Sequence, residues 1–184
     1  MEHAFIPSHG DYKKLASYQK AKIVFDGTMC FCERFYHKYD RTREQMVQAA
    51  RSGKQNIVEG CMVSGTSKKS EIKLLGVARA SLEELLEDYA DFVRTHGLKQ
   101  WKRDDERTIA IRKLAYNTDE SIETYRTLLT EYTPETAANA MIVLVHQCNY
   151  LLDRQRRTLE QSFVTTGGLH ERMHNARSAF RNRS

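Results

Sequence analysis

Apolar residues recur at steps of three and four along most of this chain, which is the spacing that lines one face of an α-helix. Four long segments show the pattern, at residues 13–39, 42–63, 68–95 and 134–164. No segment alternates apolar and polar residues as a half-buried strand does, and the chain contains only two prolines. We therefore predict an all-α protein.

The breaks between these segments contain residues typical of helix ends. Residues 64–67 (SGTS) offer a glycine to end one helix and a hydroxyl to cap the next. Gly97 follows the third segment. Residues 133–135 (TPE) combine a capping hydroxyl, a proline in the first turn and an acid at the positive end of the helix dipole.

Four long helices with short connections favour a bundle. We predict an up-down-up-down four-helix bundle over residues 1–166, in which residues 98–133 form an insert of two short helices. Residues 167–184 follow as a short basic suffix, set off by Gly167 and Gly168.

The apolar positions also predict which side of each helix faces the core. In the first helix they are Leu15, Tyr18, Phe25, Met29, Cys32, Tyr36 and Tyr39. In the second they are Met46, Ala50, Gly53, Ile57 and Cys61, and in the third Ile72, Leu75, Leu82, Leu86, Tyr89 and Val93. Small residues such as Gly53 let a neighbouring helix approach closely. Because most tyrosines fall on such stripes, we assign them to helix packing rather than to base stacking.

Arg79 interrupts the apolar side of the third helix. A buried guanidinium needs a partner, since an unpaired one costs several kcal/mol. Glu59, on the second helix, is the candidate. We predict a Glu59–Arg79 ion pair that fixes the register of the two helices, without a catalytic role.

The net charge of +5 is confined to one end of the chain. Residues 1–153 contain as many basic as acidic residues, whereas residues 154–184 contain seven arginines and two glutamates. The planar fork of arginine binds two phosphate oxygens at once. The candidate nucleic-acid contacts are therefore Arg154, Arg156, Arg157, Arg172, Arg177, Arg181 and Arg183.

The cysteines, the length of the apolar runs and the N-terminal residues narrow the class of protein. The four cysteines form no C-x-x-C pair, so we expect reduced, buried thiols. No apolar run approaches the roughly 20 residues that span a bilayer, and the N-terminus lacks a signal pattern. We expect a cytoplasmic protein without a cofactor, a structural metal or a membrane partner.

Residues 170–174 (HERMH) match the H-E-x-x-H pattern of zinc hydrolases, in which two histidines bind zinc and the glutamate acts as general base. Catalytic zinc needs a third protein ligand. The ten residues after His174 include no His, Asp, Glu or Cys. A zinc hydrolase is therefore a remote alternative, and weak metal binding by His170 and His174 is the more plausible reading.

Two stretches resemble a known family. The run QNIVEG at residues 55–60 and the run ARASLEEL at residues 78–85 are similar to motifs of the bacterial four-helix-bundle family of 23S rRNA intervening-sequence proteins. Val58 and Ala80 depart from the alanine and glycine of the family pattern. The matching residues that we assign a structural role are Asn56, Glu59, Gly60, Arg79, Ser81 and Glu84. The likeness covers about residues 15–97 and, more loosely, 134–164.

The resemblance implies a ring, commonly a homopentamer, and no catalytic residues. A related member, the accessory variability protein of diversity-generating retroelements, is a basic ring that works with a reverse transcriptase and its RNA template. The resemblance thus favours a non-enzymatic, ring-forming accessory protein that binds RNA or DNA, with a reverse transcriptase or another protein as partner. The alternative is a protein–protein interaction scaffold that binds no nucleic acid.

Overall fold

The computed structural model describes residues 10–117 and 119–181, and this part of the chain is helical without strands. The long helices are α1 (Ala16–Phe35), α2 (Arg41–Val63), α3 (Lys68–Thr95) and α6 (Pro134–Thr166). The short ones are the 3-10 turn η1 (Tyr12–Lys14), α4 (Glu106–Leu114), α5 (Glu123–Thr130) and α7 (Leu169–Arg181). The predicted all-α class is confirmed. Among the described helices, none combines the length and apolar character that a bilayer crossing requires.

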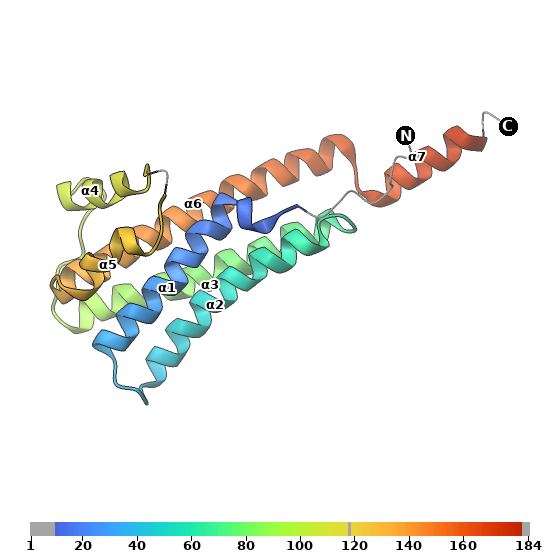
Figure 1. Ribbon diagram of the computed structural model, residues 1–184. Coiled ribbons are helices and arrows are strands. Elements are labelled where there is room, and N and C mark those ends of the chain that lie inside the picture. Colours follow the sequence, from blue (N-terminus) through green and yellow to red (C-terminus); the bar gives the residue numbers. More distant parts are fainter. Residues whose placement is uncertain (1–9, 118, 182–184) are drawn as a thin grey trace.

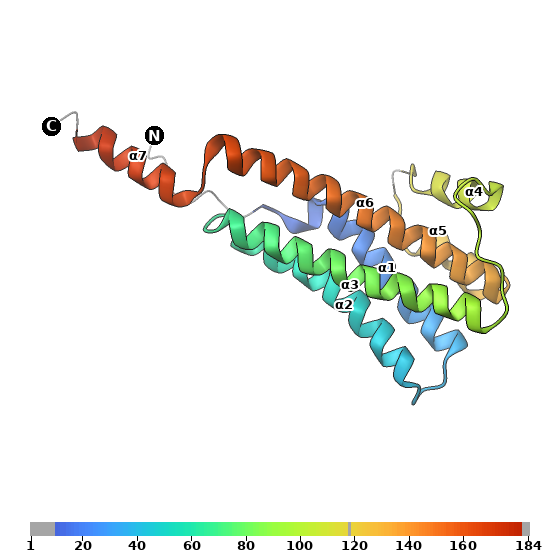
Figure 2. The same cartoon turned by 180° about the vertical axis from the view of Figure 1, so that it is seen from behind.

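The four long helices pack side by side in a closed cycle (Figures 1 and 2). α2 contacts α1 and α3, and α6 contacts the same two helices from the other side. α5 packs on both α1 and α6, whereas α4 packs mainly on α6. Residues 98–133 therefore cover one side of α6, and α7 extends past the far end of the molecule (Figure 1).

The predicted ends of α2, α3 and α6 agree with the structure to within two residues, whereas α1 is shorter at both ends than predicted. The Ser67 hydroxyl accepts from the backbone N–H of Ser70 at the start of α3, and the Thr133 hydroxyl accepts from that of Thr136 at the start of α6. Gly97 has a φ of 63°, the left-handed conformation that ends α3. With that turn in place, the Leu98 N–H donates to the Val93 carbonyl over 2.9 Å.

The inner face of α2 is also as predicted. Met46, Ala50 and Ile57 are fully buried. A methyl group added at Gly53 would lie only 2.8 Å from Cγ of Leu82. The two helices therefore approach too closely for any larger residue at this position, unless Leu82 moves.

The predicted inner face of α1 is wrong at Met29 and Tyr39, whereas Cys32 is fully buried as predicted. The helix ends at Phe35, so Tyr39 lies in the following turn and is 80% exposed, and Met29 is also exposed. The buried side instead passes through Thr28 and Phe31. Thr28 remains in the core because its hydroxyl donates to the Val24 carbonyl and accepts from the Tyr89 hydroxyl over 3.0 Å. The spacing of apolar residues cannot predict a buried threonine whose hydroxyl is hydrogen-bonded in this way.

The four thiols are free, as predicted, and three of them are buried. Burial raises the pKa of Cys32 to about 12 and that of Cys148 to about 12. Both groups are therefore neutral thiols at physiological pH and act as small core hydrophobes.

The predicted Glu59–Arg79 ion pair is wrong. Arg79 turns toward α6 instead, where its Nε lies 3.5 Å from a carboxylate oxygen of Asp153, and it also pairs with Glu83 one turn along α3. Glu59 lies exposed on α2. The physical reason is that Arg79 is at the edge of the α3–α6 contact, where solvated carboxylates are closer than any acid on α2.

A buried polar network joins the segment between α3 and α6 to the long helices. Lys20 of α1 is 4% exposed, and its ammonium group donates to Gln147 of α6 over 3.0 Å and pairs with Glu120 in the loop before α5. The same carboxylate accepts from the hydroxyl of Tyr125, a fully buried residue of α5. The network thus joins α1, α5, α6 and the insert loop through a desolvated charge.

We predict that Glu120→Gln lowers the free energy of unfolding by about 3 kcal/mol, because it leaves the Lys20 ammonium buried without a countercharge. Urea denaturation measures the change. Glu123→Gln is the matched control, since Glu123 pairs with Arg126 in solvent on the same insert and its loss should have little effect. Equal effects of the two substitutions would contradict the role given to Glu120.

Candidate functional site

The second half of α6 leaves one side of the helix uncovered. Toward α3, Asn149 donates to Glu83 over 3.3 Å and Asp153 pairs with Arg79. These contacts fix the flank of α6 that α3 occupies.

The opposite flank of α6 faces α1. Gln147 accepts from Lys20, and Gln155 accepts from the Ser17 hydroxyl over 2.5 Å. Positions between the two flanks, on the side away from the core, recur at steps of three and four. Residues 146, 150, 154, 157 and 161 occupy them, and we call this strip the outer face of α6.

The outer face of α6 is cationic and aromatic. Arg154 and Arg157 are exposed, and Tyr150 is 61% exposed. The guanidinium carbon of Arg154 lies 5.9 Å from the centre of the Tyr150 ring. Within the described residues, neither arginine forms an ion pair. Both charges are therefore available to an external anion.

Arg156 lies on the flank toward α3 and differs from its neighbours. Its side chain is only 34% exposed and pairs with Glu160 over 3.4 Å. Its Nε is buried and has no hydrogen-bond partner in the part of the chain that the structure describes. Of the three clustered arginines that we predicted to contact nucleic acid, Arg154 and Arg157 are therefore accessible. Arg156 instead pairs with a glutamate of the same helix.

The basic suffix forms a helix of its own, α7. Gly167 has a φ of 67°, which ends α6 and turns the chain before α7 begins (Figure 2). Arg177 and Arg181 are exposed on α7. The Arg172 side chain and all of Arg183 lie outside the described residues. The arginines thus fall on two separate helices rather than on one surface.

The glutamate of the HERMH sequence has a structural use. Glu171 accepts the backbone N–H of Gly168 over 2.7 Å, which is the contact that a glutamate in the third helical position makes at a helix start. His174 is exposed, and the side chain of His170 is not among those described. Where the structure describes side chains, no group of three or more His, Cys, Asp or Glu is placed to hold a metal.

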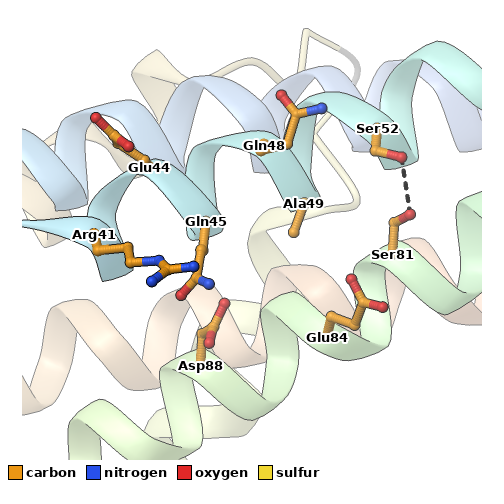
Figure 3. Close-up of a pocket in the computed structure, with 9 residues that line it drawn as sticks. All are labelled: Arg41, Glu44, Gln45, Gln48, Ala49, Ser52, Ser81, Glu84 and Asp88. Carbon is orange, nitrogen blue, oxygen red and sulfur yellow. Dashed lines mark hydrogen bonds between the residues drawn. The ribbon is translucent and has the colours of Figure 1, made fainter.

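A polar groove runs between α2 and α3 on the side of the molecule away from α6 (Figure 3). Its lining residues are Arg41, Glu44, Gln45, Gln48, Ala49, Ser52, Ser81, Glu84 and Asp88. Burial raises the pKa of Asp88, and the carboxylates of Asp91 and Glu84 add to the effect. The groove is open and acidic, and Arg41 is the only cation along it among the described residues.

The family-like motif residues divide between this groove and the helix contacts. Ser81 and Glu84 line the groove, and the Ser81 hydroxyl lies 3.0 Å from that of Ser52. Asn56 donates to the Ser52 carbonyl over 2.9 Å. Gly60 faces α3, where a Cβ would lie 3.5 Å from the Glu71 carbonyl. Of the six motif residues, Glu59 and Glu84 are therefore exposed, whereas Gly60 and Ser81 are buried.

Tyr150 is the residue of the candidate site that the sequence analysis missed. Its assignment to packing is wrong, since its ring projects from the outer face of α6. The available signal was its spacing of four and seven residues from Arg154 and Arg157, which places all three on one side of a helix.

Comparison of the chain with protein-family models, with curated proteins and with solved structures finds no match. The functional interpretation therefore depends on the geometry of this molecule and on the motif resemblance described above.

Proposed function

We propose that this chain is a non-enzymatic accessory protein that binds the phosphate backbone of nucleic acid through exposed arginines of α6 and α7. The observation that carries the proposal is the pairing pattern on α6. The nearby acids Asp153 and Glu160 are engaged by Arg79 and Arg156, which leaves Arg154 and Arg157 without a carboxylate partner among the residues that the structure describes. Two uncompensated guanidinium groups one turn apart attract phosphate.

Such contacts are independent of sequence and sensitive to salt. Each phosphate that is neutralised releases condensed counterions, so affinity falls as the salt concentration rises. Phosphate contacts also set the position of the protein on the nucleic acid without reading its bases. This behaviour suits an accessory protein that holds RNA or DNA for another enzyme, such as a reverse transcriptase.

We further propose that the fold is an up-down-up-down four-helix bundle with residues 98–133 as an insert, and that it assembles into a ring. The cyclic packing of α1, α2, α3 and α6 supports the bundle. The resemblance to intervening-sequence proteins, whose motif residues Ser81 and Glu84 here line an open groove, supports contact between copies at that groove.

Light scattering of the purified protein tests the ring. We expect a mass several times the 21.4 kDa of one chain, and a shift toward the monomer in Gln48→Trp, which places bulk in the groove. Gln100→Trp, at an exposed position between α3 and α4, is the control. A wild-type protein of 21.4 kDa would contradict assembly.

Nucleic-acid binding is tested with the double variant Arg154→Gln/Arg157→Gln. We expect weaker binding to RNA at low salt and a salt dependence that is shallower by about 1.4 in log–log slope, from about 0.7 for each lost contact to a single strand. Fluorescence anisotropy at several salt concentrations gives both quantities.

Arg51→Gln/Lys73→Gln removes the same charge from exposed positions of α2 and α3 and should bind as the wild type does. A wild-type protein that binds neither RNA nor DNA at low salt would refute the proposal and favour the interaction scaffold. Equal losses in the two double variants would show that net charge alone, rather than this face, governs binding.

A further inference from the structure

Tyr150 projects from the molecule although it lies on a helix whose first half is buried. Its side chain is 61% exposed, whereas Tyr89 and Tyr125 are fully buried. Among the described residues, its ring contacts no other aromatic ring, and the Arg154 guanidinium lies over it as a cation–π partner. An exposed tyrosine ring held beside a cation offers a flat apolar surface in an electropositive setting.

The outer face of α6 has the dimensions of a short stretch of nucleic acid. With a rise of about 1.5 Å per residue, Arg154 lies about 6 Å and Arg157 about 10.5 Å along the helix from Tyr150. Measured along the axis of a stacked strand, successive phosphates advance by about 3.4 Å. The two arginines are therefore spaced to meet phosphates two to three steps from a base that contacts Tyr150.

The contacts on either side keep this arrangement in place. Gln147 and Gln155 anchor α6 to α1, and Asn149 and Asp153 anchor it to α3. The face therefore belongs to a rigid helix rather than to a loop. Upstream, the Gln147 amide donates to the Arg112 carbonyl over 3.5 Å, which brings the end of α4 against α6 and closes the face on that side.

We propose that the outer face of α6 binds single-stranded nucleic acid, with Tyr150 stacking on an unpaired base and Arg154 and Arg157 holding phosphates two to three steps along the same strand. The inference rests on the proposed function and specifies its ligand. A duplex offers the same phosphates but keeps its bases stacked inside the helix. Only a single strand can use the tyrosine ring as well as the arginines.

The test compares a mixed-sequence single-stranded RNA of twelve nucleotides with the same sequence as a duplex, by fluorescence anisotropy at two salt concentrations. We expect the wild type to prefer the single strand. Tyr150→Ala should weaken single-strand binding by about tenfold, which corresponds to a typical loss for one stacked base. Its duplex affinity and its salt dependence should stay at wild-type values, because no phosphate contact is lost.

Two further variants separate stacking from other effects. Tyr150→Phe keeps the ring and should bind as the wild type does. Tyr39→Ala removes a tyrosine that is even more exposed (80%) and that also lies beside a lysine (Lys38, 5.8 Å from the ring centre). Tyr39 lies in the α1–α2 turn, and its loss should have no effect. Circular dichroism verifies that each variant is folded.

Tighter binding to the duplex, or wild-type single-strand affinity in Tyr150→Ala, would overturn the inference. If the arginine double variant still lost affinity in that case, the proposed function would stand and only the single-strand assignment would fail. Absence of all binding by the wild type would instead refute the proposed function itself.

Discussion

From Ala137 to Val145, every side chain of α6 is buried, because α1 and α3 pack on two of its sides while α4 and α5 cover the rest. A helix that is apolar all round is stable only when it is enclosed. Residues 98–133 are therefore part of the core, although they interrupt the sequence of long helices. That cover is held in place by the buried Lys20–Glu120 pair and by Asn139, which accepts from the Trp101 backbone N–H and donates to the Lys99 carbonyl.

The enclosure ends near His146, and the character of α6 changes there. Beyond this point side chains of α6 still contact α1 and α3 on two flanks, but the residues of the outer face are exposed. The exposed residues of that side include the Tyr150 ring and two arginines, Arg154 and Arg157, which form no ion pair within the described part of the chain. The packing that stabilises the first half of the helix thus fixes the direction in which the candidate binding face of the second half points.

Helix positions were predictable because their ends have local chemical causes, such as the capping hydroxyls of Ser67 and Thr133. The close approach at Gly53 was predictable because a small residue stands on the apolar side of its helix. The burial of Lys20 was not, since its partner Glu120 lies 100 residues away and apolar spacing gives no sign of it. Arg79 had carboxylates available on more than one helix, and only the packing selects among them. Tyr150 was missed because its exposure depends on which flanks of α6 the neighbouring helices take.

The account makes one central claim, that the outer face of α6 is the surface that meets nucleic acid. Photo-crosslinking with a 4-thiouridine-labelled single-stranded RNA, followed by mass spectrometry of the crosslinked peptides, tests it most directly. The account predicts that crosslinks concentrate on the α6 peptide that contains Tyr150, with further ones on α7. Crosslinks confined to other surfaces, such as the α1–α2 turn around Tyr39, would contradict it.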